Sequence, residues 1–162
     1  QLPVGARVAI VDWHQTLKRV LVVEPQDLRA CRELQNAGYH VLVLSYVGRG
    51  PDGDRHRSTQ GEIAGANLAD NVDGVAFTFN ACRPYNQPDK KVWRLPGGGR
   101  LPSKADIADY LDAELLFDDN WEIVSEVNGE TRCLGIHVYR GSSLAFHVAG
   151  ILDQTERPAT VS

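Results

Sequence analysis

The sequence predicts an α/β fold, a three-layer and doubly wound arrangement with about five parallel strands in one sheet. Two observations support this prediction. Short runs of β-prone residues alternate with helical segments, and these runs are continuously apolar, as in strands that are buried on both faces. The 162 residues, 43% of them apolar, suffice for one domain with its own core.

The predicted strands are short, mostly apolar and bounded by polar or turn-forming residues. They cover residues 7–11, 41–44, 74–79, 115–117 and 133–139. The first run contains no Gly or Pro, so we expect it to be a buried central strand. A short β-prone segment at 18–23 separates it from the first helix.

The predicted helices begin at recognisable start signals. Pro25 suits the first turn of one helix, and Gly38 suits the left-handed position just after it. Sequences with the spacing of a capping box, TQGE and SKAD, start two others. The helices are expected at residues 26–37, 59–71, 103–112, 121–127 and 144–152, and the fourth is expected to stop near Gly129.

The remaining segments are predicted to be irregular. Gly, Pro and charged residues mark loops at 46–58 and 80–103. The domain is expected to span residues 1–152, with a tail at 153–162. Because the chain starts at Gln1 and contains no Met, we expect it to be a fragment of a longer protein.

Charge and cysteine content narrow the function classes. A net charge of −4 argues against a dedicated nucleic-acid or membrane-surface protein. Cys31, Cys82 and Cys133 lack C-x-x-C spacing, so we expect reduced thiols and an intracellular, cytoplasmic location. No signal peptide and no apolar run of ~18 to 20 residues is present, so no membrane association is expected.

Three of the histidines are interpreted as packing residues. His40, His137 and His147 lie in or beside apolar runs and lack the spacing of metal ligands.

Polar residues directly follow three predicted strands. Asp12, Ser45 and the pair Asp118 and Asp119 come at strand ends, and Lys104 lies in the first turn of a helix. In a parallel sheet these strand ends meet at one edge, where ligands bind. Carboxylates with a hard divalent cation, a hydroxyl and an ammonium group are the components that hold a phosphoryl group. Each residue alone also fits a turn, a helix cap or a solvated charge.

The same motifs resemble those of the haloacid dehalogenase (HAD) superfamily, which would make the fold Rossmann-like. The segment DWHQTL is similar to its first motif D-x-D-x-T at Asp12 and Thr16, and VLVLS, SKADIADYL and LLFDDN are similar to the other three motifs. The resemblance covers the chain from about residue 7 to 139.

The resemblance implies a role for each motif residue. Asp12 would be the nucleophile that forms an aspartyl-phosphate. Ser45 and Lys104 would bind the phosphate. Asp118 would bind Mg²⁺ together with Asp12 and the backbone carbonyl of His14, and Asp119 would be a ligand or support one. Further candidate substrate contacts are Tyr46, next to Ser45, and Arg94 in the loop at 80–103.

The chain departs from the family pattern at His14, where family phosphatases have a second Asp that acts as general acid and base. A positioned proton donor is typically worth ~10² to 10⁴ in rate. Two hypotheses remain open: His14 takes over this role, or it is tolerated in a weakened or inactive site. Family members without the second Asp include dehalogenases and phosphonate-cleaving enzymes.

The gaps between the motifs predict a member without a large cap. Residues 17–24 allow only a short flap, and residues 80–103 are too few for a folded cap. An open site suits a phosphorylated macromolecule, such as a phosphoprotein or a nucleic-acid end, or a cap donated by a partner protein.

The second of these gaps is also basic, which favours anionic partners, although an ordinary solvated loop remains the alternative. Its cations are Arg83, Lys90, Lys91, Arg94, Arg100 and Lys104 at its end, against Asp89, with Tyr85 and Trp93 available for stacking.

Two functional interpretations follow. The first is a Mg²⁺-dependent phosphohydrolase that uses Asp12 as nucleophile and His14 as acid and base. The second is an inactive domain of the same fold that serves binding or scaffolding in a larger protein.

Overall fold

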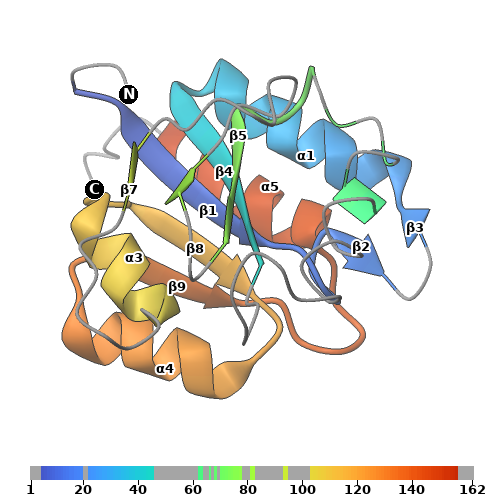
Figure 1. Cartoon of the computed structure of the whole chain (residues 1–162). Coiled ribbons are helices and arrows are strands. Elements are labelled where there is room, and N and C mark those ends of the chain that lie inside the picture. Colours follow the sequence, from blue (N-terminus) through green and yellow to red (C-terminus); the bar gives the residue numbers. More distant parts are fainter. Residues whose placement is uncertain are drawn as a thin grey trace, which may run out of the picture.

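The computed structural model describes residues 5–19, 22–45, 62–63, 66, 68, 70–77, 81–82, 93–94 and 103–156. Its main feature is a sheet with the strand order β5-β4-β1-β8-β9. These strands are β1 (Arg7–Asp12), β4 (Tyr39–Ser45), β5 (Gly74–Phe77), β8 (Leu115–Asp118) and β9 (Leu134–His137). All neighbouring pairs are parallel, which confirms the predicted parallel α/β sheet with β1 in the centre (Figure 1).

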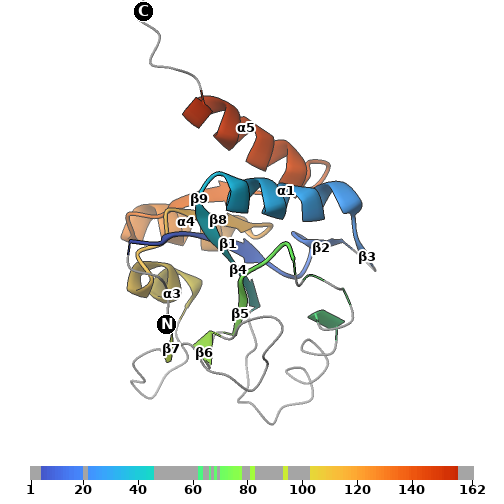
Figure 2. The ribbon, with the colours of Figure 1, turned by 90° about the horizontal axis from the view of Figure 1, so that it is seen from above.

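Helices cover both faces of the sheet (Figure 2). One face packs against α1 (Pro25–Asn36) and α5 (Leu144–Glu156), and the other packs against α3 (Lys104–Tyr110) and α4 (Trp121–Glu130). This arrangement makes the fold doubly wound and Rossmann-like, as predicted.

The strand β1 divides its side chains between the two cores. Ala9 and Val11 pack in the core on the α1 and α5 side, whereas Val8 and Ile10 pack on the α3 and α4 side. All four are fully or almost fully buried. Alternation along a strand sends neighbours to opposite faces, so a strand covered on both sides has to be apolar throughout. The continuous apolar run in the sequence has this origin.

The start signals of two helices act as predicted. Pro25 occupies the first turn of α1, and Gly38 follows this helix with a φ of +98°. At the start of α3, the Ser103 side chain accepts from the Asp106 amide, and the Asp106 carboxylate accepts from the Ser103 amide. This capping box satisfies two amides of the first turn and fixes the position of Lys104.

Several element boundaries differ from the predictions. The helix α4 continues through Gly129 to Glu130, because a glycine weakens a helix without ending it. Asp118 belongs to β8, and α5 extends to Glu156 into the predicted tail. The β-prone segment 18–23 contributes a small antiparallel pair, β2 (Lys18–Arg19) and β3 (Val22–Val23).

A second antiparallel pair occurs in the segment predicted to be irregular. It consists of β6 (Ala81–Cys82) and β7 (Trp93–Arg94). The loop at 46–58, most of the helix expected at 59–71 and most of the basic loop lie outside the described residues, and so do the side chains of Cys82, Trp93 and Arg94. Cys31 and Cys133 are buried free thiols, as predicted for these two.

The helix α4 lies unusually close to the edge strand β9. A Cβ atom at Gly135 would meet the backbone oxygen of Val124 at 3.0 Å. Asn128 uses its side-chain amide to pair with the backbone of Gly135, accepting from its N–H at 2.8 Å and donating to its oxygen at 3.2 Å. Asn128 therefore covers polar groups of the sheet edge at this point.

Within the described part of the chain, no helix combines the length and the apolar composition needed to cross a bilayer.

Candidate active site

A buried ion-pair cluster joins three elements at the carboxyl edge of the sheet. Asp12 ends β1 and Asp118 ends the neighbouring strand β8, while Lys104 is the first residue of α3. The Lys104 ammonium donates to Asp12 Oδ1 at 2.5 Å and to Asp118 Oδ2 at 2.7 Å. Their side chains are only 4%, 7% and 1% exposed for Lys104, Asp12 and Asp118, respectively. The predicted convergence of these three residues is therefore confirmed.

The remaining oxygens of the two carboxylates also accept hydrogen bonds. The Thr16 hydroxyl donates to Asp12 Oδ2 at 3.0 Å, and the backbone N–H of Asn120 donates to Asp118 Oδ1 at 2.9 Å. Thr16 is held by a tight turn in which the Leu17 amide donates to the backbone oxygen of Asp12. Both carboxylates are thus oriented from two sides, which offsets part of the cost of their burial.

Burial dominates the acid-base properties of this cluster. It raises the pKa of Asp12 to about 8, and the charge of Asp118 adds to the effect while Lys104 opposes it. Burial also raises the pKa of Asp118, again against Lys104. Burial alone would lower the pKa of Lys104, but the charges of Asp12 and Asp118 outweigh it and raise that pKa. The ammonium is therefore held charged between two carboxyl groups that are difficult to ionise.

The acidic residues of the cluster match the donor set of a hard divalent cation. Asp12, Asp118 and Asp119 each offer a carboxylate oxygen, and these atoms lie within 4.8 Å of one another. Oxygen-only ligands suit Mg²⁺, and the three carboxyl groups, once ionised, carry more negative charge than one ammonium balances. The residues present therefore fit Mg²⁺, and Asp119 joins the site as a partly buried member.

Ser45 adds a buried hydroxyl at the same edge. It ends β4, in which Leu44 is the register partner of Asp12. The Ser45 side chain is fully buried, and its hydroxyl oxygen has no hydrogen-bond partner within the described part of the chain. Leaving a buried polar group unpaired costs about 1–3 kcal/mol, so such groups need an explanation. A ligand at this sheet edge would supply the partner.

The other predicted site residues are placed less fully. His14 is half-buried in the turn after β1 and forms an isolated backbone bridge with Lys18. Its ring is not part of the acidic cluster of the described residues, which consists of the three aspartates. Tyr46 and the side chain of Arg94 lie outside the described residues.

Glu62 is a charged neighbour of this turn that the sequence did not indicate. Its carboxylate accepts from the Trp13 indole at 3.1 Å and pairs with Lys18 at 3.0 Å. The hydrogen bond from Trp13 is the main cause that lowers the pKa of Glu62, and the Lys18 and His14 charges contribute. No local signal in the sequence pairs residue 62 with residues 13 and 18.

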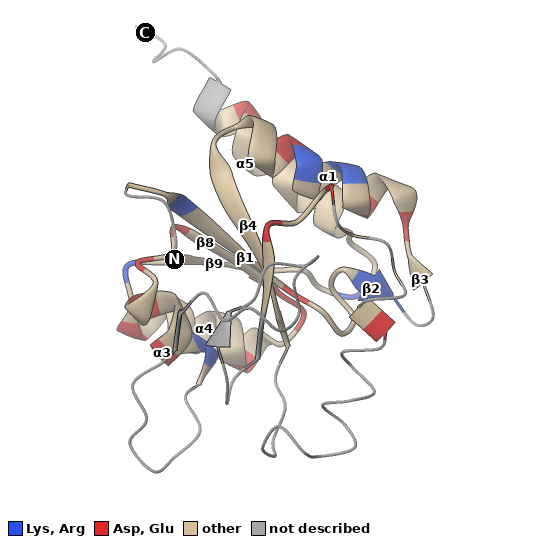
Figure 3. Cartoon of the chain, turned by 45° about the horizontal axis from the view of Figure 1, so that its top comes forward, with Lys and Arg blue, Asp and Glu red and all other residues tan. Residues whose placement is uncertain are grey.

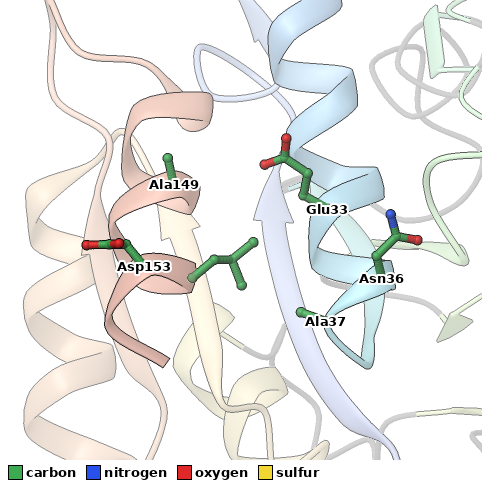
Figure 4. Close-up of a pocket in the computed structure, with 6 residues that line it drawn as sticks. Glu33, Asn36, Ala37, Ala149 and Asp153 are labelled. Carbon is green, nitrogen blue, oxygen red and sulfur yellow. The ribbon is translucent and has the colours of Figure 1, made fainter. Parts of the chain in front are cut away.

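A pocket of about 450 Å³ between α1 and α5 is separate from this cluster (Figure 4). Glu33 and Asn36 line it from α1, Ala37 lines it just after this helix, and Ala149 and Asp153 line it from α5. Ala37 directly precedes the turn into β4, so this pocket lies at the amino ends of the strands. Ligand sites in parallel sheets form at the carboxyl ends, where Asp12 and Asp118 lie.

Comparison with known proteins adds no assignment, since no protein-family model and no curated protein matches the chain.

Proposed function

We propose that the chain is a Mg²⁺-dependent phosphohydrolase domain that works through a phosphorylated Asp12, in the manner of the HAD-like enzymes its motifs resemble. The observation that carries the proposal is the buried cluster of Asp12, Lys104 and Asp118, with Asp119 alongside. A purely structural ion pair does not need a third carboxylate oxygen within 4.8 Å of the other two, or a buried Ser45 hydroxyl that has no partner among the described residues.

The proposed reaction has two steps. An oxygen of the Asp12 carboxylate attacks phosphorus, and the bond from phosphorus to the leaving-group oxygen breaks, so the leaving group takes up a proton. Water then attacks the aspartyl-phosphate, loses a proton, and releases phosphate with the free Asp12 carboxylate. His14, two residues after Asp12, is assigned to both proton transfers.

The other residues position and charge the site. Lys104 orients Asp12 and brings a positive charge to the phosphoryl oxygens, and the Ser45 hydroxyl donates to one of these oxygens. The Thr16 hydroxyl holds the second oxygen of Asp12. Asp12, Asp118 and Asp119 would hold the Mg²⁺. When bound, this ion would keep the buried carboxylates ionised and offset charge on the phosphoryl group.

One observation favours the second candidate function, an inactive binding or scaffolding domain. The Lys104 ammonium pairs with Asp12 and Asp118 at the same time, so it already satisfies the would-be nucleophile. An ion pair of this kind can serve the fold alone. The absence of a second Asp at position 14 fits the same function.

Hydrolysis of p-nitrophenyl phosphate with Mg²⁺ separates the two functions. Wild type is expected to turn over, Asp12→Asn to fall to background, and His14→Ala to lose ~10² to 10⁴ in kcat. Asp109→Asn, an exposed change on α3, is the matched control and should keep the wild-type rate. Beryllofluoride is expected to bind wild type on Asp12 and not to bind Asp12→Asn.

Turnover that survives in Asp12→Asn would rule out the proposed nucleophile. Wild type without turnover and without Mg²⁺ binding would assign the domain to binding or scaffolding.

A further inference from the structure

A pocket of about 460 Å³ adjoins the candidate active site. Asp119 belongs both to the acidic cluster and to the pocket wall, so the two are continuous. Gln15 reaches the same wall from the turn that follows Asp12, with a backbone φ of 63°. The remaining wall includes Arg19, Tyr139 and Arg140. Pockets of this size hold small molecules or single groups of larger ones.

Tyr139 is one of the residues that line this pocket, and its aromatic ring packs against two histidines. The residue is 48% exposed, although its ring lies between His137 at 6.0 Å and His147 at 5.3 Å, measured between ring centroids. Hydrogen bonds hold the two flanking rings. His137 Nε2 donates to the backbone oxygen of Asp119 at 3.0 Å, and His147 Nε2 lies 2.9 Å from the Ser142 hydroxyl.

The Ser142 hydroxyl completes this support. It donates to the backbone oxygen of Tyr139 at 2.7 Å, so it has to accept from His147 Nε2. The Tyr139 backbone and ring are therefore both anchored while the ring stays accessible. A ring that is ordered before binding offers stacking at a low entropic cost.

Two arginines, Arg19 and Arg140, line the pocket, and they differ in whether their charge is available to a ligand. Arg19, from the basic strand β2 (blue in Figure 3), is engaged with the chain itself. It donates to the buried Asp27 carboxylate at 3.2 Å and to the backbone oxygen of Ser142 at 2.8 Å. Arg19 therefore fixes the wall of the pocket, while Asp27 balances its charge. Arg140, which is exposed, supplies the guanidinium that can pair with an anion.

We infer that this pocket is the leaving-group subsite, and that it selects small phosphate esters whose leaving group combines a planar ring with a second negative charge. The inference rests on the proposed function, because it takes the phosphoryl group to lie at Asp12. Tyr139 stacks on the ring, Arg140 pairs with the second negative charge, and Asp119 marks the boundary with the phosphoryl centre.

Four esters test the two features independently. The compound 4-carboxyphenyl phosphate has both the ring and the charge, phenyl phosphate has the ring, phosphoglycolate has the charge, and ethyl phosphate has neither. The quantity compared is kcat/KM of each variant divided by that of wild type, so the different intrinsic reactivities of the esters cancel.

Tyr139→Leu is expected to lose about tenfold on the two aryl esters and to leave the two alkyl esters unchanged. Arg140→Gln is expected to lose about threefold on the two esters that carry a carboxylate, and nothing on the other two. Tyr110→Leu, at a tyrosine that is 49% exposed on α3, and Arg132→Gln, at an exposed arginine, are the matched controls and should change none of the ratios.

The outcomes separate this inference from the proposed function. Equal losses on all four esters, or no loss, would overturn the subsite and leave the phosphohydrolase proposal standing. Absence of turnover with every ester in wild type would overturn both.

Discussion

Replacing Lys104 by Met tests the energetics of the buried cluster most directly. The change keeps much of the volume and apolar stem of the side chain but removes the ammonium that joins Asp12 and Asp118. Two carboxylates would then remain in a site where both are less than a tenth exposed. Their mutual repulsion and their burial would no longer be offset by a positive charge.

The expected cost is large for a single substitution. Removing one partner of a buried ion pair typically destabilises a protein by about 3–5 kcal/mol. For a domain of this size each kcal/mol corresponds to about 2–4 °C, so we expect Tm to fall by roughly 6–20 °C at pH 9, where Asp12 is ionised. The loss should be smaller at pH 5, because Asp12, whose pKa is raised to about 8, is protonated there and needs no lysine to balance it.

The chain offers a matched control in Lys18→Met. Lys18 pairs with Glu62 at 3.0 Å, but these side chains are 19% and 35% exposed, so solvent screens the pair. Such pairs contribute about 0–1 kcal/mol, and the variant should lose no more than roughly 4 °C. Thermal unfolding followed by circular dichroism measures both. Equal Tm values for the two variants at pH 9, or a larger Lys104→Met loss at pH 5 than at pH 9, would refute the argument.

Two further predictions concern pH, metal and packing. Folding raises the Asp12 pKa from 3.8 to about 8, so between these pH values the folded state holds a proton that the unfolded chain releases. Without metal, the free energy of unfolding should therefore fall with rising pH, by up to ~1.4 kcal/mol per pH unit across that window. Mg²⁺ needs ionised carboxylates, so the stabilisation of the fold by Mg²⁺ should grow with pH, to about 2.7 kcal/mol at a Mg²⁺ concentration of 100 times Kd. Calorimetric scans from pH 5 to 8 in which Mg²⁺ has no effect would contradict this. Gly135→Ala should cost about 1–3 kcal/mol, because its Cβ would meet the Val124 oxygen at 3.0 Å. The control is Gly129→Ala inside α4, where the added Cβ would meet no neighbouring group within 4 Å apart from the backbone of its own helix. This variant should gain about 0.5–1 kcal/mol in urea titrations. The reverse order of the two variants would contradict the described packing of α4 on β9.

The layout of the fold was predictable because each strand of the central sheet is short, apolar and followed by a helix start or a turn. The run that became β1 is apolar on both faces because helices cover both faces. Boundaries were less predictable. Gly129 has the composition of a helix end, but packing of the buried Val124 and Val127 carries α4 past it.

The core of the candidate site was predictable for a topological reason. Parallel strands bring their carboxyl ends to one edge, so Asp12 and Asp118 had to approach each other once β1 and β8 paired. The position of Lys104 followed from the capping box at Ser103. Its pairing with both aspartates did not follow, because a lysine in a first helical turn is equally compatible with solvent.

The pocket beside the site could not be predicted in this way. Tyr139 and Ser142 follow the edge strand β9, and the Ser142 hydroxyl donates to the backbone oxygen of Tyr139. Arg19, from a distant segment, pairs with Asp27 and donates to the backbone oxygen of Ser142. These contacts have no spacing rule in the sequence. His137 and His147 were interpreted as packing residues, and in the structure their rings pack against Tyr139, which lines the pocket.

Because Lys104 stabilises the fold, loss of activity on its removal cannot assign it a chemical role, and Asp12→Asn is the more discriminating change. Asparagine has the same shape and keeps an acceptor for Lys104 or Thr16, while it removes a charge whose burial is unfavourable. We therefore expect Asp12→Asn to lie within about 1 kcal/mol of wild type at pH 8, in urea unfolding, and to be inactive. A variant that is both stable and inactive would assign Asp12 to the chemistry. A variant that loses stability and activity together would indicate that the carboxylate serves the fold, as the scaffolding function requires.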